Sequence, residues 1–90
     1  MAFTAANATA STTTILAHNP HRKYLLIIND SDVDVYLMFG AAAVLNTGIR
    51  LNGGGSSYLS SVITNNLDTR DLRVIHGGAG NQNILMIEYP

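Results

Sequence analysis

The three histidines are the residues of this chain best suited to bind a metal ion. His18 and His21 flank an Asn-Pro pair, and His76 follows much later in the chain. Imidazole nitrogens are common zinc ligands, but zinc-binding motifs place them at fixed spacings such as HExxH. No such spacing occurs here, and the chain has no cysteine that could complete a ligand set. We therefore assign no metal-binding residue and no cofactor.

Three aspartates at alternating positions suggest a second kind of metal site. Asp30, Asp32 and Asp34 stand where the first ligands of a calcium-binding loop would stand. That loop also requires a glycine and a glutamate further on, at positions that are Val35 and Ala41 here. The pattern fails, and we expect these carboxylates on the solvent-exposed side of a hairpin.

The glycine-rich segments do not complete a catalytic motif. His76-Gly77-Gly78 is similar to the glycine segment that forms the oxyanion hole of some hydrolases. The chain has neither the GxSxG turn that carries their nucleophile nor a GxxxxGK[ST] phosphate-binding loop. We assign no catalytic residue and expect the protein not to be an enzyme.

Composition limits the partners of the chain. Charged residues make up 12% of it, compared with about 25% in an ordinary soluble domain. The formal net charge is −1 and the cations are scattered, so we expect no nucleic-acid partner. No apolar run approaches the roughly 20 residues of a membrane-spanning helix, so we expect no membrane partner. A weakly charged surface is suited to packing against protein neighbours.

Short apolar and β-branched runs, separated by Gly, Pro, Asn and Asp, predict an all-β fold. We expect about seven short antiparallel strands in a β-sandwich or small barrel. They are Thr12–Ala17, Lys23–Asn29, Val33–Phe39, Gly48–Asn52, Ser56–Ile63, Leu72–His76 and Asn83–Tyr89. The acidic turn Asp30–Asp32 should join the second and third of these strands into a hairpin.

The chain divides into an N-terminal arm, residues 1–11, and a single β domain, residues 12–90. The first segment is rich in Ala, Thr and Asn and shows no apolar stripe. It is either a disordered tail or an extended arm that becomes ordered against a partner. We favour the arm, with Phe3 as the side chain that would anchor it.

Two of the expected strands, Lys23–Asn29 and Asn83–Tyr89, are apolar on both faces, so both of their faces must be covered. We expect them to lie centrally, with one set of alternating residues in the core. The other set is covered either by the loop Ala41–Thr47 or by a neighbouring subunit. The residues expected in the core or in an oligomer interface are Tyr24, Leu25, Leu26, Ile27, Ile28, Leu85 and Ile87.

A few large side chains outside these strands are candidate contacts with a partner. Tyr36 is expected on the strand face opposite Val35 and Leu37, where its ring could serve as a platform for a sugar. The competing explanation is that the tyrosines cover the core or an interface, where they are enriched. The candidate partner contacts are Phe3, Tyr36, Val44 and Leu45.

The segments NPHRKYLLIINDSDVDVYLMFG, GIRLNGGGS and IHGGAGNQNILMIEY together resemble small β-rich virion proteins of tailed bacteriophages. The resemblance covers residues 19–89 as a pattern of strands and turns. The proteins it points to are similar in role to capsid decoration (cement) proteins. It implies an antiparallel sandwich or barrel that assembles as a homo-oligomer on a particle. It also implies a location in the virion, with the major capsid protein and further copies of the chain as partners.

The resemblance leaves two functions open. The first is a structural virion protein that decorates and stabilises a phage capsid by binding between shell subunits. The alternative is a tail- or fibre-associated, lectin-like receptor-binding module, which would expose Tyr36 or Tyr58 beside Asp or Asn side chains.

Overall fold

The computed structural model describes residues 2–78 and 80–90, which form eight β-strands and no helix. The strands are β1 (Ala2–Ala8), β2 (Thr13–Leu16), β3 (Tyr24–Asn29), β4 (Val35–Phe39), β5 (Ile49–Leu51), β6 (Ser57–Ser61), β7 (Leu72–His76) and β8 (Gln82–Tyr89). The expected all-β fold is confirmed, with eight strands instead of about seven. Strands β2 to β8 coincide with those expected from the sequence, and their ends differ by at most two residues.

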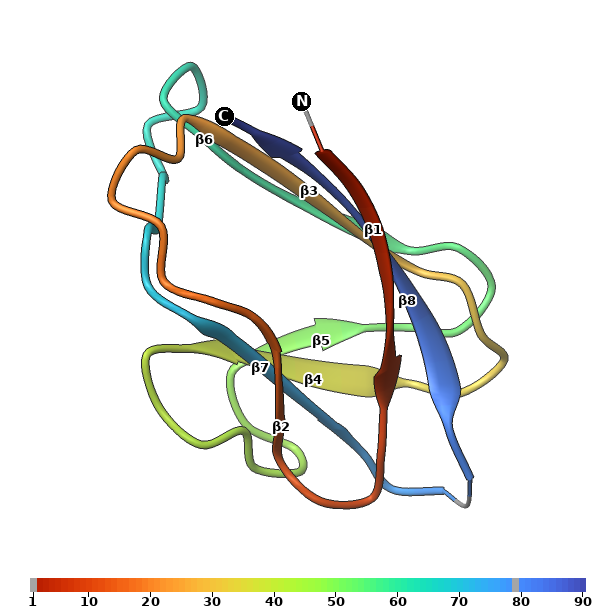
Figure 1. Cartoon of the computed structure of the whole chain (residues 1–90). Coiled ribbons are helices and arrows are strands. Elements are labelled where there is room, and N and C mark those ends of the chain that lie inside the picture. Colours follow the sequence, from red (N-terminus) through yellow and green to blue (C-terminus); the bar gives the residue numbers. More distant parts are fainter. Residues whose placement is uncertain (1, 79) are drawn as a thin grey trace.

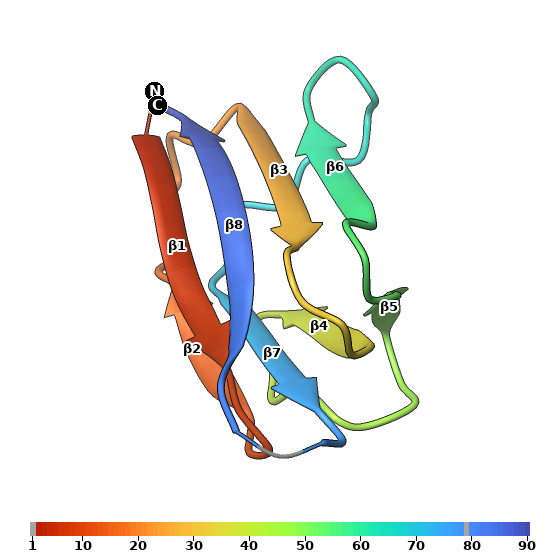
Figure 2. The ribbon, with the colours of Figure 1, turned by 90° about the vertical axis from the view of Figure 1, so that its right-hand side faces the viewer.

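The strands form two antiparallel sheets of four, in the orders β1-β8-β3-β6 and β2-β7-β4-β5. Figures 1 and 2 show the two sheets as the layers of a sandwich. Every connection crosses from one sheet to the other except the one between β4 and β5. This strand order is that of the eight-stranded jelly roll, in which two Greek keys are folded together.

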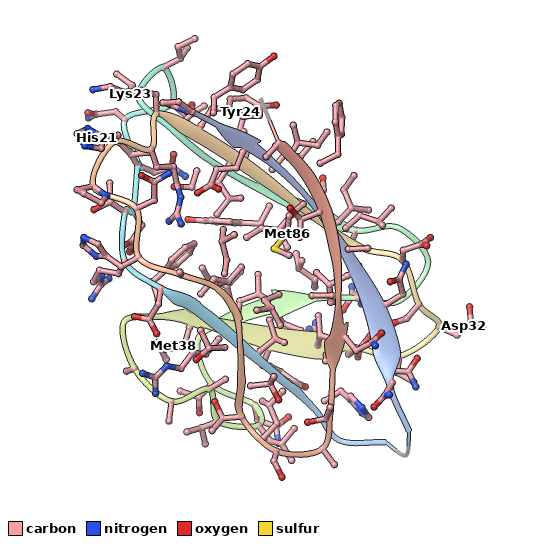
Figure 3. The ribbon with its side chains drawn as sticks, viewed as in Figure 1. His21, Lys23, Tyr24, Asp32, Met38 and Met86 are labelled. Atoms are coloured by element: carbon pink, nitrogen blue, oxygen red, sulfur yellow. The ribbon has the colours of Figure 1, made fainter. Side chains whose placement is uncertain are left out.

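The core lies between the two sheets and follows the two-residue period of the strands. Leu25 and Ile27 of β3 face Val35 and Leu37 of β4, and all four side chains are fully buried. Met86 of β8 lies between the sheets in Figure 3. The other buried apolar residues of this cluster are Ala8, Phe39, Leu51, Leu72, Val74 and Ile84.

The prediction that β3 and β4 form a hairpin is wrong. β3 pairs with β6 and β8, whereas β4 pairs with β5 and β7 in the other sheet. The buried side chain of Asn29 explains the difference, because its Nδ2 donates to the carbonyl oxygens of Val33 over 2.7 Å and Leu51 over 2.9 Å. These bonds hold the chain as it passes between the sheets. The central position of β3 and β8 is confirmed, and the two strands are paired.

The extended N-terminal arm is not confirmed, because Ala2–Ala8 form the edge strand β1 of the same domain. β1 pairs with β8 along its whole length, from Ala2 opposite Glu88 to Ala8 opposite Gln82. Its side chains are mostly exposed and only Ala8 is fully buried, so no apolar period marks the strand in the sequence. β1 is held in place by its backbone hydrogen bonds to β8, which the pattern of its side chains cannot reveal.

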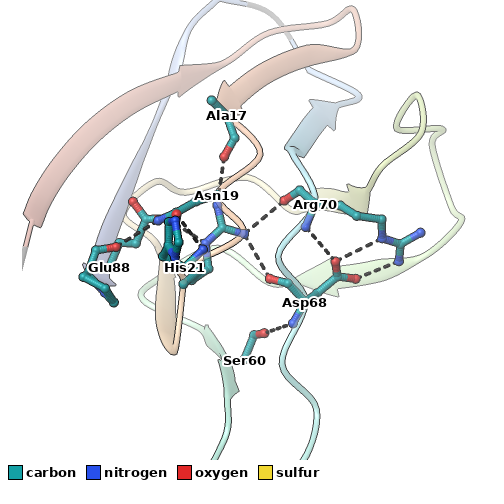
Figure 4. A network of polar contacts seen from close by, with 9 residues as sticks. Ala17, Asn19, His21, Ser60, Asp68, Arg70 and Glu88 are labelled. Carbon is teal, nitrogen blue, oxygen red and sulfur yellow. Dashed lines mark hydrogen bonds and ion pairs between the residues drawn. The ribbon is translucent and has the colours of Figure 1, made fainter.

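A buried arginine ties three parts of the chain together, in the network of polar contacts that Figure 4 shows. The side chain of Arg22, in the β2–β3 connection, has no exposed area. Its Nε donates to Glu88 Oε2 over 2.6 Å. Its Nη atoms donate to the backbone carbonyls of Ala17, Asp68 and Arg70. The guanidinium therefore links the β2–β3 connection, the β6–β7 connection and β8.

The ion pairs outside this network are at least partly open to solvent. Arg70 donates to Asp68 over 2.7 Å, and this side-chain hydrogen bond holds the pKa of the Asp68 carboxyl below its usual range. Arg73 lowers the pKa of Asp71 in the same way, by a side-chain hydrogen bond of 2.8 Å. Water screens pairs that are open to solvent, so they add little to the stability of a fold. Arg22 is therefore the ionic contact that matters for stability.

Candidate interaction surface

The outward side of the β1-β8-β3-β6 sheet is apolar across all four strands. Phe3 of β1 lies opposite Ile87 of β8, and Ile87 lies opposite Leu26 of β3. Leu26 in turn lies opposite Leu59 of β6, so one apolar row crosses the whole sheet. We call the outward apolar residues of this sheet the outer face. They are Phe3, Ala5, Tyr24, Leu26, Ile28, Leu59, Leu85, Ile87 and Tyr89.

The chain itself covers the outer face only in part. Leu26 is half-buried, whereas Tyr89 is 42% exposed and Phe3 is 71% exposed. The ring of Tyr89 packs edge-on against Tyr24, with 5.5 Å between ring centroids. An open hollow of about 280 Å³ lies where the small Ala5 leaves space beside Phe3. The outer face can therefore receive a side chain from a neighbouring surface.

The outer face carries no charge. Among the described residues, no Asp, Glu, Lys or Arg points outward from β1, β8, β3 or β6. The outward side of the other sheet is different, because Arg50 lies opposite Tyr36 and Arg73 lies opposite Met38. One side of the sandwich is thus an ordinary hydrated surface, while the other is suited to exclusion from water.

The structure divides the expected core-or-interface residues into two groups. Leu25 and Ile27 are fully buried in the core. The others lie on the outer face; they are Tyr24, Leu26, Ile28, Leu85 and Ile87. Sequence reasoning did not select Leu59, whose membership depends on the pairing of β6 with β3. It also left out Tyr89, although alternation with Ile87 places both on one side of β8.

The loop between β4 and β5 does not cover the outer face. Its Asn46 accepts a hydrogen bond of 3.0 Å from the hydroxyl of Tyr36, which places the loop against the other sheet. Val44 and Leu45 of this loop are 53% and 40% exposed. Cover of the outer face by this loop is therefore wrong.

Tyr36 lies between two hollows on the hydrated side. One hollow, of about 240 Å³, includes Asp34 and Asn46 in its wall. The other, of about 230 Å³, includes Arg50. An aromatic ring between a carboxylate and a guanidinium offers both stacking and hydrogen bonding to a small polar ligand. Tyr58 points inward instead, and its ring centroid lies 6.5 Å from that of Phe39.

The three histidines do not converge on one site in the part of the chain that the structure describes. His76 is buried at the end of β7, where its Nδ1 accepts from the Gly78 N–H over 3.0 Å. Its Nε2 therefore carries the proton and donates to the Gly80 carbonyl over 2.7 Å. His18 and His21 are exposed in the β2–β3 connection. Residues 2–78 and 80–90 hold no cluster of three or more potential metal ligands.

The three aspartates of the β3–β4 connection are exposed. Asp30 accepts a hydrogen bond of 3.0 Å from Asn83, and Asp34 accepts one of 3.1 Å from the Gly53 N–H. Asp32 projects into solvent at the tip of the connection in Figure 3. They occupy a crossover between the sheets, not the hairpin turn that the sequence suggested.

The described residues form strands and connections, and they include no helix that could span a membrane. No family model matches the chain, and neither a curated protein nor a solved structure shows significant similarity to it.

Proposed function

We propose that the protein is a structural assembly protein whose outer face packs against further copies of itself. The observation that supports this proposal is the uncharged apolar row from Phe3 to Leu59 across the β1-β8-β3-β6 sheet. Homo-oligomer interfaces are more apolar than other protein surfaces and resemble a domain core cut in half. Two outer faces packed together would reproduce such a core.

The energetics favour a protein partner over water. Full burial of a Leu or Ile side chain contributes about 1.5–3 kcal/mol, so covering one that is already half-buried contributes less than about 1 kcal/mol. The outer face offers several such residues, among them Leu26, Ile28, Leu85 and Ile87. Because association itself has an unfavourable entropy, the face must be covered as a unit to give a stable contact.

In its finer form, the proposal is that the assembly belongs to a virion and decorates a phage capsid. The resemblance of residues 19–89 to small virion proteins supports this, as does the jelly-roll strand order, which occurs in viral capsid domains. The major capsid protein would be the partner, and the exposed loop residues Val44 and Leu45 would contact it. Each copy would make only weak contacts with the shell, but an oligomer makes several at once, and this multivalency raises its overall affinity for the shell.

Co-sedimentation with empty phage shells stripped of decoration protein tests the particle assignment. We expect the wild type to pellet with the shells and to saturate them at a fixed ratio. Val44→Asp combined with Leu45→Asp should reduce the pelleted fraction at least tenfold, while Val62→Asp, on a loop that is not assigned to the contact, should not. The assignment would be contradicted if the wild-type protein stayed in the supernatant while the shells pelleted, whichever phage shells were tested.

A second candidate function has one specific observation in its favour. Tyr36 lies beside Asp34 and Asn46, which is the arrangement expected of a lectin-like module. If this site binds a sugar, a glycan array should give a defined signal that Tyr36→Ala removes. Tyr36→Phe should retain part of it, because the ring remains while the bond to Asn46 is lost. An array without a signal for the wild type would exclude this function for the sugars tested.

A further inference from the structure

The free edge of β1 has none of the features that normally prevent strands from pairing between molecules. β1 is seven residues long and forms one uninterrupted ladder with β8. Its sequence, AFTAANA, has no charge and no proline. A strand at the edge of a sheet presents a row of unpaired N–H and C=O groups, and long uncharged edges readily add another strand.

The other three edges of the sandwich are protected. β2 has four residues and a register shift between Thr14 and Leu16. β5 has three residues, and one of them is Arg50. The free edge of β6 is occupied by a side chain from the turn that follows it. Asn66 Nδ2 donates to the carbonyl of Leu59 over 2.8 Å, and Asn66 Oδ1 accepts from the N–H of Ser61 over 3.1 Å.

We propose that two copies of the chain pair through their β1 edges, antiparallel and related by a twofold axis, to form one continuous eight-stranded sheet. A second copy is the occupant because each β1 brings a strand of the same length, already extended, and without charge to repel its twin. A register centred on Ala5 pairs all seven residues and keeps outward residues opposite outward residues. Phe3 then faces Asn7 of the other copy.

This pairing goes beyond the proposed function, because it does not depend on the outer face being covered. It joins the two outer faces side by side, so that one apolar surface spans both copies. Edge pairing and face packing are therefore separate contacts. Ala5 and Ser57 both point to the outward side of the sheet, so a lysine at either position charges that side, and the difference between the two variants reports edge pairing. An assembly that uses both grows beyond a dimer.

Pairing through the β1 edge can be tested with a lysine placed at one end or the other of a row of residues that lie opposite one another across the sheet. Ala5 of β1 and Ser57 of β6 end the row that runs through Leu85 and Ile28. Both residues are exposed, so Ala5→Lys and Ser57→Lys should fold equally well. Ala5→Lys places two like charges opposite each other at the twofold axis, and it should weaken dimerisation at least tenfold in sedimentation equilibrium. Ser57→Lys should leave the dimer unchanged.

Charge reversal at the same position provides a rescue. Ala5→Glu should also weaken the dimer, whereas an equimolar mixture of Ala5→Lys and Ala5→Glu should form the mixed dimer, because opposite charges then meet at the axis. Restored dimerisation in the mixture supports the proposal and shows that both variants are folded. Equal effects of the lysine at both edges, a mixture that remains monomeric, or dimers that Leu26→Asp removes and Ala5→Lys does not, would overturn it.

Discussion

Replacement of Arg22 by alanine is expected to destabilise the fold by about 3–5 kcal/mol, which is the usual cost of removing one partner of a buried ion pair. The substitution leaves the largely buried Glu88 carboxylate without its cation. It also leaves the carbonyls of Ala17 and Asp68 without their donor. Denaturation in urea, followed by circular dichroism, measures the loss. Arg22→Lys should recover only part of it, because an ammonium group cannot reach several acceptors as the planar guanidinium does.

Arg70→Ala is the matched control for Arg22→Ala. Arg70 also pairs with an acidic side chain, but its own side chain is 61% exposed. Its loss should therefore lower the free energy of unfolding far less than the loss of Arg22 does. Similar effects of the two substitutions would show that Arg22 does not tie the three parts of the chain together.

Two neighbouring positions of β3 should respond in opposite ways to the same substitution. Ile27 is fully buried, so Ile27→Asp places a carboxylate in the core and should unfold the chain. Leu26 points outward on the same strand, so Leu26→Asp should leave the fold intact and abolish packing through the outer face. Circular dichroism reports the fold of both variants, and sedimentation velocity reports their association.

The contrast between Leu26 and Ile27 separates the two faces of one strand. A folded Ile27→Asp variant would show that the inward side of β3 is not the core. A Leu26→Asp variant that is unfolded would show that the outward side is needed for stability of the single chain. Either result would remove the distinction on which the proposed assembly depends.

The period of apolar residues was sufficient to predict most of the strands. β7 was predicted from Leu72 to His76 with both ends correct, because apolar alternation and a following glycine run mark it clearly. β1 was not predicted as a strand, because its small exposed residues carry no period and its order comes from β8. The hairpin prediction failed because the turn composition of residues 30–34 does not reveal that Asn29 directs the chain to the other sheet.

The candidate surface could be predicted in part for a similar reason. A strand that is apolar on both faces must be covered twice, and this argument identified Leu26, Ile28, Leu85 and Ile87 from the sequence. It could not decide between cover by a loop and cover by a neighbour, because that depends on where residues 41–47 pack. Nor could it identify the role of Arg22, whose four partners come from three separate segments of the sequence.

Sedimentation velocity of the wild type and Leu26→Asp over a range of concentrations tests the central claim most directly, namely that the outer face is a contact between copies. The wild type should associate beyond the dimer as its concentration rises, because edge pairing and face packing then act together. Leu26→Asp should stop at the dimer joined through β1. A wild type that remains monomeric at every concentration, or a Leu26→Asp variant that associates as the wild type does, would contradict the claim.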